Sequence, residues 1–265
     1  MIVAEYQDYF RTITQSDHAD LSGQLAAKWG NNQFIRPEPY ISFVTMAGVH
    51  DNGWWGWDMS PKITEDGRPM NFYQIDRDEW ATGNGVGIDN YSPRDSYGGL
   101  VLNMHFTGLA QQRYGTEPSM KARTDVPVIA RFVKEREAQA SDLKKRLQAS
   151  VEMSDYVSQE KLWHNYLLQQ VMDRFSLYFC CDYPIESSSM EPVPTSWDKS
   201  TKINLDPINE GTVTVSPYPF AETPLRVAVR GRLITKRKYE TDADLQEEYL
   251  NAPRRMFEFE IRKKS

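Results

Sequence analysis

Apolar residues recur at helical spacing through most of the first 183 residues, with polar residues between them. A period of about 3.6 residues predicts amphipathic helices whose apolar faces pack together. The first helix is expected to begin at Thr14, an N-cap residue with Asp17 three positions later, and to end before Gly30. Further helices are expected over residues 40–51, 96–113, 126–150 and 155–182.

Alternation of apolar and polar residues, which is typical of strands, occurs near both ends of the chain. Residues 2–13 predict a hairpin, and a short helix capped at Thr241 is expected among the later strands. Those later strands are expected over Thr212–Ser216, Leu225–Thr235 and residues 257–261.

The segments between these elements complete the predicted fold. Residues 54–95 are rich in Gly, Pro, Asp and Trp and predict a long loop with short helical pieces, which at that length usually serves a function. Prolines and serines predict a linker or flap over residues 184–203. The chain is therefore expected to be mainly α, with a helical core and hairpin over residues 1–183. A small antiparallel sheet is expected in a β-rich subdomain over residues 204–265, which makes the fold α+β overall.

Composition limits the classes of partner. A net charge of -6 disfavours nucleic acid and anionic membranes, and no apolar run approaches the roughly 18 to 20 residues that span a bilayer. The N-terminus lacks the pattern of a signal peptide, and the only two cysteines, Cys180 and Cys181, are adjacent. We therefore expect a cytoplasmic protein with a small-molecule substrate. The charged helix face over residues 134–146 is either solvated or part of a homodimer contact.

The adjacent pair His50-Asp51 is the sharpest chemical feature, because imidazole and carboxylate together are common ligands of transition metals. The chain has only four histidines, and His18 and His105 also lie on predicted apolar helix faces. Asp173 lies in the middle of the most apolar helix, where a carboxylate is costly unless it is paired or bound to metal. The same residues could instead have purely structural roles: His50-Asp51 as a helix cap, the histidines as hydrogen-bonded core residues, and Asp173 as a partner in a salt bridge.

Helix phase separates the fourth histidine from this group. His164 precedes Asp173 by nine residues, and at about 100° per residue the two lie on opposite faces of one helix. Gln169 lies on the Asp173 face instead. We therefore expect a site that contains Asp173 and Gln169 but excludes His164.

The order His18, His50-Asp51, Asp173 resembles the HD superfamily of metal-dependent phosphohydrolases, which are helical proteins. More closely, the chain is similar to an uncharacterised bacterial family, domain of unknown function 3891. The stretches that carry the similarity are Ile13–Trp29, His50–Asp58, His105–Leu109, Leu167–Cys180 and Pro217–Phe220. The resemblance implies an HD-like helical core and one divalent ion (Fe, Mn, Ni or Zn) held by His18, His50, Asp51 and Asp173. Trp54 stands where such phosphohydrolases often carry a lysine, which weakens the assignment of a phosphate substrate.

Three functions are compatible with these residues. The first is metal-dependent hydrolysis of a small molecule, with a phosphoester as one candidate, in which Asp51 or Asp58 takes a proton and His105 binds substrate or a second metal. The second is an HD-type iron oxygenase with two irons, and the third is a binding protein with a degenerate site. The residues expected to contact substrate are Trp54, Trp57, Arg174 and Gln169; core packing is the alternative role of the tryptophans.

Overall fold

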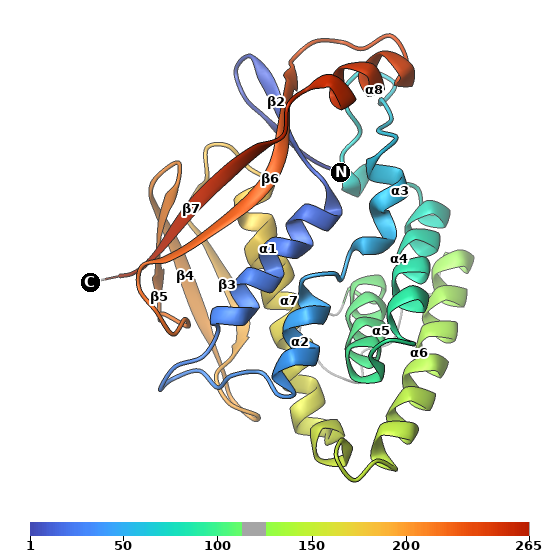
Figure 1. Cartoon of the computed structure of the whole chain (residues 1–265), viewed down its shortest axis with the longest axis vertical. Coiled ribbons are helices and arrows are strands. Elements are labelled where there is room, and N and C mark those ends of the chain that lie inside the picture. Colours follow the sequence, from blue (N-terminus) through green and yellow to red (C-terminus); the bar gives the residue numbers. More distant parts are fainter. Residues whose placement is uncertain (113–125, 265) are drawn as a thin grey trace.

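A seven-stranded mixed sheet curls around one side of a stack of helices (Figure 1). The structure, a computed structural model, describes residues 1–112 and 126–264. The strand order is β1-β2-β6-β7-β5-β4-β3. The strands are β1 (Ile2–Glu5), β2 (Tyr9–Ile13), β3 (Ser188–Pro194), β4 (Ser200–Asn209), β5 (Thr212–Ser216), β6 (Leu225–Thr235) and β7 (Arg255–Lys263).

Strand β6 joins the two ends of the chain into one sheet. Its first part, Leu225–Gly231, pairs with β7, and its last part, Arg232–Thr235, pairs with β2 of the N-terminal hairpin. Strands β5 and β7 run parallel, whereas the other neighbours in the sheet are antiparallel. The hairpin is therefore an edge of the large sheet.

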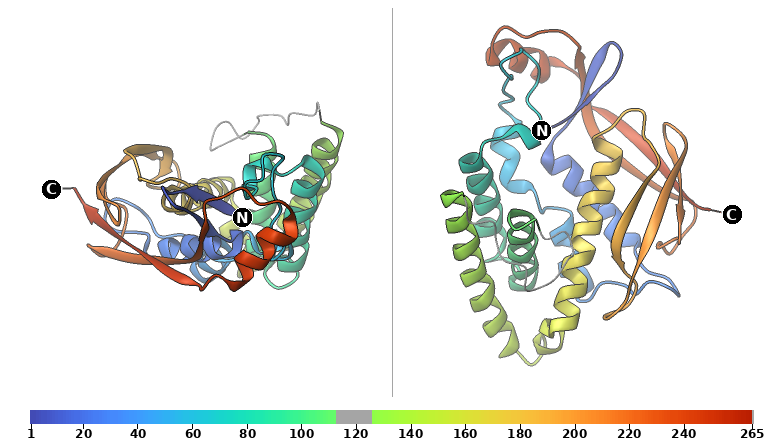
Figure 2. Two further views of the ribbon diagram at one scale, coloured as in Figure 1. Left: turned by 90° about the horizontal axis from the view of Figure 1, so that it is seen from above. Right: turned by 180° about the vertical axis from the view of Figure 1, so that it is seen from behind.

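The prediction of a mainly helical, HD-like fold with a small C-terminal antiparallel sheet is wrong. The sheet is mixed and seven-stranded, and it uses both ends of the chain (Figure 2). Part of the error lies in residues 184–203, where prolines and serines predict a linker but β3 is found. Because β3 pairs only with β4, it is an edge strand, and prolines are tolerated at a sheet edge.

The helices form layers against the sheet. Helix α1 contacts β6, and α7 contacts β3, so these two helices lie between the sheet and the remaining helices (Figure 1). Helices α2 and α5 pack next, followed by α4 and α6. The helices are α1 (Gln15–Lys28), α2 (Tyr40–Ala47), α3 (Trp55–Asp58), α4 (Arg77–Tyr91), α5 (Ser96–Ala110), α6 (Pro127–Gln148), α7 (Gln159–Cys180) and α8 (Asp242–Asn251), with short 3-10 turns at Asn52–Trp54, Phe72–Gln74 and Ser154–Val157.

Most of the predicted helices and strands are confirmed, with small shifts at their ends. The Thr14 side chain caps α1 by accepting a hydrogen bond from the backbone N–H of Asp17, and Thr241 caps α8 in the same way. Helix α2 ends at Ala47, so His50 lies in the turn that follows it. The helix predicted over 96–113 ends at Ala110, and residue 113 lies outside the described residues.

Helix α4 is the largest element that the sequence does not predict, because its glycines have poor intrinsic helix propensity. Two of these glycines, Gly83 and Gly87, pack closely against neighbouring segments, whereas a Cβ atom on Gly85 would meet nothing within 4 Å. A Cβ atom on Gly53, in the turn after His50-Asp51, would lie 2.1 Å from the Gly83 carbonyl oxygen of α4 and 2.6 Å from the Gly87 nitrogen. Only backbone without side chains can approach this closely. Gly83 and Gly87 thus form the part of α4 that packs against the turn that carries His50-Asp51.

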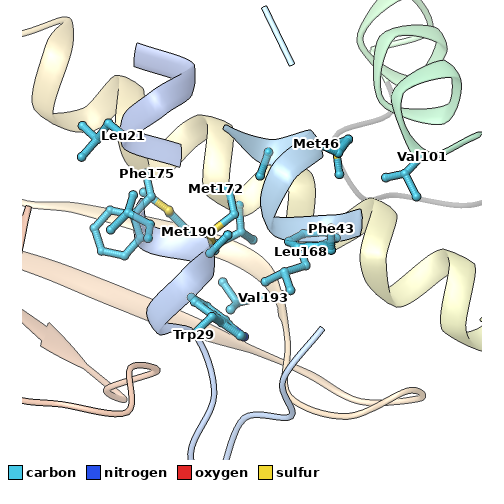
Figure 3. Packing of buried hydrophobic residues seen from close by; sticks show 14 of the residues in the cluster. Leu21, Trp29, Phe43, Met46, Val101, Leu168, Met172, Phe175, Met190 and Val193 are labelled. Carbon is cyan, nitrogen blue, oxygen red and sulfur yellow. The ribbon is translucent and has the colours of Figure 1, made fainter. Parts of the chain in front are cut away.

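One continuous apolar core fills the space between the sheet and the helices (Figure 3). Leu21 of α1, Phe175 of α7 and Met190 of β3 are among its buried members. Arg11 of β2 crosses this region and donates from its guanidinium to the carbonyls of Phe179 and Cys180, which caps the C-terminal end of α7. Among the described helices, none is both long and apolar enough to cross a membrane.

Candidate metal centre

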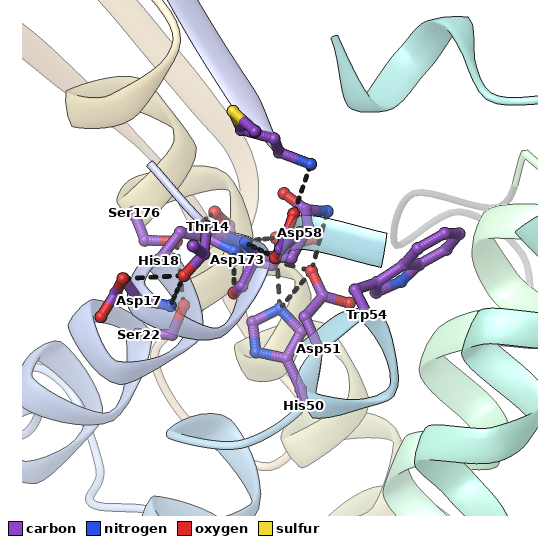
Figure 4. A network of polar contacts seen from close by, with 12 residues as sticks. Thr14, Asp17, His18, Ser22, His50, Asp51, Trp54, Asp58, Asp173 and Ser176 are labelled. Atoms are coloured by element: carbon purple, nitrogen blue, oxygen red, sulfur yellow. Dashed lines mark hydrogen bonds and ion pairs between the residues drawn. The ribbon is translucent and has the colours of Figure 1, made fainter. Parts of the chain in front are cut away.

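Three histidines and two aspartates from four parts of the chain meet in the interior. His18 lies in the first turn of α1, His50 and Asp51 in the turn after α2, His105 in α5 and Asp173 in the middle of α7. Figure 4 shows His18, His50, Asp51 and Asp173 directed toward one another. The imidazoles are 1% exposed, and the two carboxylates are about a tenth exposed.

The two segments that carry His18 and His50 are held together by a close helix crossing. A Cβ atom on Gly23 of α1 would lie 2.7 Å from the Cα atom of Gly48, the C-cap residue of α2. The absence of a side chain at position 23 allows the two backbones to touch there. His50 follows Gly48 by two residues, so this contact sets the distance between the turn and α1.

Asp173 is the centre of the cluster. Its Oδ1 atom lies 3.0 Å from His18 Nε2 and 3.5 Å from His50 Nε2, and its Oδ2 atom lies 3.6 Å from His105 Nε2. His50 Nε2 lies 3.7 Å from Asp51 Oδ2. Two atoms that bind one ion at about 2.1 Å lie about 3.0 to 3.4 Å apart when they subtend 90 to 109°. The observed separations are close to those of ligands around one metal ion.

The ring orientation of two histidines is fixed by the backbone. The Nδ1 atom of His18 lies 2.8 Å from the carbonyl oxygen of Gln15, and that of His50 lies 2.9 Å from the carbonyl oxygen of Ala47. A carbonyl only accepts hydrogen bonds, so Nδ1 carries the proton and Nε2 presents its lone pair when the ring is neutral. Histidine ligands of metals are usually oriented by such a hydrogen bond.

Several buried atoms of the cluster have no hydrogen-bond partner among the described residues. These atoms are His50 Nε2 and both ring nitrogens of His105. Buried polar atoms are rarely left without a hydrogen-bond partner, because each unsatisfied atom destabilises the fold by about 1 to 3 kcal/mol. A cation bound between the carboxylates would satisfy His50 Nε2, so the donor set fits a divalent transition metal.

The charges of the cluster favour a cation. Burial opposes the charged form of His50, but the carboxylates of Asp51 and Asp173 outweigh it and raise the pKa of His50 to about 9. Burial also disfavours the charged form of Asp173, but the hydrogen bond with His18 and the nearby imidazole of His50 hold its pKa well below the usual value. Burial raises the pKa of Asp51 and lowers that of His105 to about 4. Without a metal, a proton on His50 thus provides positive charge between the two acids.

A cavity of about 80 Å³ opens beside the cluster. Its polar lining comes from four residues of the cluster, His18, Asp51, His105 and Asp173, and from Gln15 and Asn84. Among the described residues that line it, there is no Lys or Arg. Its apolar walls are Trp54, Phe72, Ile75, Trp80, Phe106, Leu109 and Leu177.

Trp54, for which the sequence predicts a substrate contact, lines the cavity. Trp57 is not among the lining residues and packs edge-on against Trp54, with 6.1 Å between ring centroids. Arg174 donates to the backbone carbonyl of Glu191 in β3 rather than lining the cavity. Gln169 is fully buried one turn before Asp173, also outside the lining.

Asp58 lies outside the cluster and stabilises the segment that carries His18. It is fully buried, accepts a hydrogen bond from the backbone N–H of Gln15 at 2.6 Å, and lies 2.6 Å from the Met1 amino group. It does not line the cavity, so the structure gives no contact for the catalytic role expected of it. Its bond to Gln15 instead fixes the start of α1, which carries His18.

The fourth histidine lies apart from the cluster. His164 is buried in the first half of α7, its Nδ1 atom lies 3.1 Å from Asn165 Oδ1, and its ring packs edge-on against Trp197. Sequence reasoning missed two polar residues of the cavity, Gln15 and Asn84. Gln15 looks like an ordinary first-turn residue, and Asn84 lies in a glycine-rich segment that predicts a loop. Neither position carries a pattern that marks it.

Comparison with known proteins gives one match. The family model described as "Protein of unknown function (DUF3891)" matches residues 1–236, which includes the whole cluster. No curated protein and no solved structure matches the chain. The match covers most of the chain and carries no activity with it. The chain belongs to this uncharacterised family.

Proposed function

We propose that this protein is a metal-dependent hydrolase of a small molecule, with one divalent ion held by His18, His50, Asp51 and Asp173. The observation that carries the proposal is the convergence of the Asp51 and Asp173 carboxylates on His50 Nε2, with His18 Nε2 directed at Asp173 as well. The order of these residues along the chain also resembles that of the HD phosphohydrolases, although the fold is different.

The shared histidine supports a single ion. Two sets of residues can each surround a metal, namely His18 with His50 and Asp51, and His50 with His105 and Asp173. His50 belongs to both sets, but its Nδ1 atom donates to Ala47 and only Nε2 remains. One nitrogen lone pair binds one ion, so the two sets cannot be filled completely at the same time. This argues against a two-iron oxygenase.

In the proposed hydrolysis, different residues of the cavity have different roles. A divalent ion, when bound, lowers the pKa of a coordinated water and polarises the oxygen of a substrate. Gln15 donates from its side chain to Asp51 Oδ2 at 3.2 Å and so holds that carboxylate in place. His105 lines the cavity and has no hydrogen-bond partner among the described residues, which supports a role for it in carrying a proton to the leaving group. The apolar walls exclude bulk water.

Metal analysis tests the proposal. The full chain is purified without chelators, its metal content is measured, and the stripped protein is titrated with Fe²⁺, Mn²⁺, Ni²⁺ and Zn²⁺ while thermal stability is followed. We expect one equivalent of metal per chain and a rise in melting temperature at saturation. Two equivalents would contradict the single-ion site, and no binding of any of these ions would leave a binding protein with a degenerate site.

A further inference from the structure

The side-chain amide of Asn84 has an orientation that chemistry fixes. The indole N–H of Trp54 donates to Asn84 Oδ1 at 2.9 Å. Because an indole nitrogen is only a donor, the Asn84 oxygen must face Trp54 and the Nδ2 amide must face the other way. Asn84 lines the cavity and is 3% exposed, yet Nδ2 is buried with no acceptor among the described residues. A residue of the cavity wall thus carries a hydrogen-bond donor that has no acceptor among the described residues.

Gln15 supplies the matching acceptor. Its Nε2 amide donates to the Asp51 carboxylate, which can only accept when it is ionised, so the orientation of this amide is fixed as well. Its Oε1 atom is buried with no donor among the described residues, and Gln15 lines the same cavity. A hydrogen bond to a ligand would satisfy this buried oxygen.

The rest of the lining decides against an anion. The other walls are aromatic and aliphatic, and no Lys or Arg is found among the described lining residues. One divalent ion and the two carboxylates of Asp51 and Asp173 sum to zero charge. A phosphate dianion would therefore add uncompensated charge to a largely apolar site, which is strongly unfavourable.

We propose that the substrate is a small uncharged carboxamide, whose carbonyl oxygen accepts from Asn84 Nδ2 and whose N–H donates to Gln15 Oε1. This inference rests on the proposed hydrolase function and names its substrate class. The oxygen of water bonds to the carbonyl carbon, the C–N bond breaks, and a proton from water goes to the leaving nitrogen. The products are a carboxylic acid and an amine or ammonia. The cavity of about 80 Å³ restricts the acyl part to a few carbon atoms.

Binding to the metal-loaded full chain tests the substrate class, with acetamide and propionamide as probes and inorganic phosphate as the competing chemistry. Metal content is measured first, so a chain that binds no metal refutes the proposed function before the substrate is addressed. We expect millimolar binding of the amides, seen by calorimetry and by fluorescence of Trp54 and Trp80, and weaker binding of phosphate. Tighter binding of phosphate than of either amide, or no amide binding to the metal-loaded chain, would overturn the inference.

Two variants of α4 locate the contact. Asn84→Asp keeps the size of the side chain and its acceptor for Trp54 but removes the donor, so amide affinity should fall at least about tenfold. Asn90→Asp, an exposed position of the same helix, is the matched control and should bind amides like the unmodified chain. Both variants should retain one equivalent of metal. Release of ammonia from propionamide should fall in Asn84→Asp alone; equal amide affinity in the two variants would refute the contact.

Discussion

His50 and His164 are both 1% exposed, yet their surroundings give them opposite chemistry. His50 faces the carboxylates of Asp51 and Asp173, which raise its pKa to about 9, whereas burial beside Asn165 lowers the pKa of His164 to about 4. Both residues lie in apolar surroundings, so burial does not distinguish them. Neighbouring acids, and not burial, therefore mark a histidine as a candidate metal ligand.

The largest loss of metal affinity is expected from removing Asp173, the acid that all three histidines of the cluster face. Asp173→Asn keeps the size of the side chain and removes its charge. Loss of a second-sphere partner typically weakens metal binding 10- to 100-fold, so loss of this ligand should weaken it more than about 100-fold. Titration of the stripped protein measures the affinity. Asp182→Asn, an exposed position after the same helix, is the control, and equal affinities in the two variants would exclude Asp173 as a ligand.

The same substitution at His50 and at His164 tests whether only His50 binds the metal. His50→Asn should weaken metal binding at least about tenfold because it removes an Nε2 ligand. His164→Asn should leave the metal affinity unchanged, because its ring packs on Trp197 away from the cluster. Metal content and affinity are measured side by side. If both substitutions reduce metal binding equally, the effect comes from loss of the fold and the contrast between the two histidines disappears.

A smaller effect is expected from the support behind the cluster. Asp58→Asn weakens the hydrogen bond that holds the backbone of Gln15 and leaves the Met1 amino group without its counter-charge. Because Asp58 acts on Asp51 only through Gln15, it lies one step beyond a second-sphere partner, so metal affinity should fall about tenfold or less. Calorimetric titration with the preferred metal measures the change. An unchanged affinity would show that Asp58 serves stability alone.

The smallest effect concerns His164 and pH. Its folded pKa of about 4 lies below the unfolded value of 6.5, so the unfolded chain binds more protons between these values and stability falls as the pH falls. Between pH 7 and 5.5, metal-free protein should lose roughly 1 kcal/mol more stability than metal-free His164→Asn. Urea denaturation at both pH values measures this difference. Parallel losses in the two proteins would mean that His164 is protonated alike in both states.

Local patterns predict most elements of this fold but not how the sheet is assembled. Caps such as Thr14 and alternation such as that of Leu225–Thr235 are short-range features, and the elements they predict are confirmed. Pairing of the N-terminal hairpin with the end of β6 joins residues more than two hundred positions apart, and no local pattern encodes it. The same holds for α4, where close packing of glycines against Gly53 overrides their poor helix propensity.

The candidate site, like the fold, is predicted only in part, because its cluster residues are visible in the sequence but the rest of its lining is not. The rarity of histidine, the adjacent pair His50-Asp51 and an acid within an apolar helix are visible in the sequence, and the structure brings these residues together. Helix phase also suffices to set His164 apart. Which neighbours line the cavity depends on the layers of helices. Proximity in sequence therefore points to Arg174 and Asp58, which do not line it, and no local pattern marks Gln15 and Asn84, which do.

The hydrogen bonds from His18 to Gln15 and from His50 to Ala47 each span three residues within one turn of backbone. Each imidazole is therefore aimed by its own segment as soon as that segment folds. An arriving ion has little ordering left to impose, so the rotational entropy of these rings is lost during folding instead. The protein, more than the metal, then dictates the coordination geometry. Ions that demand a different arrangement would be discriminated against even where their intrinsic affinity for nitrogen ligands is higher.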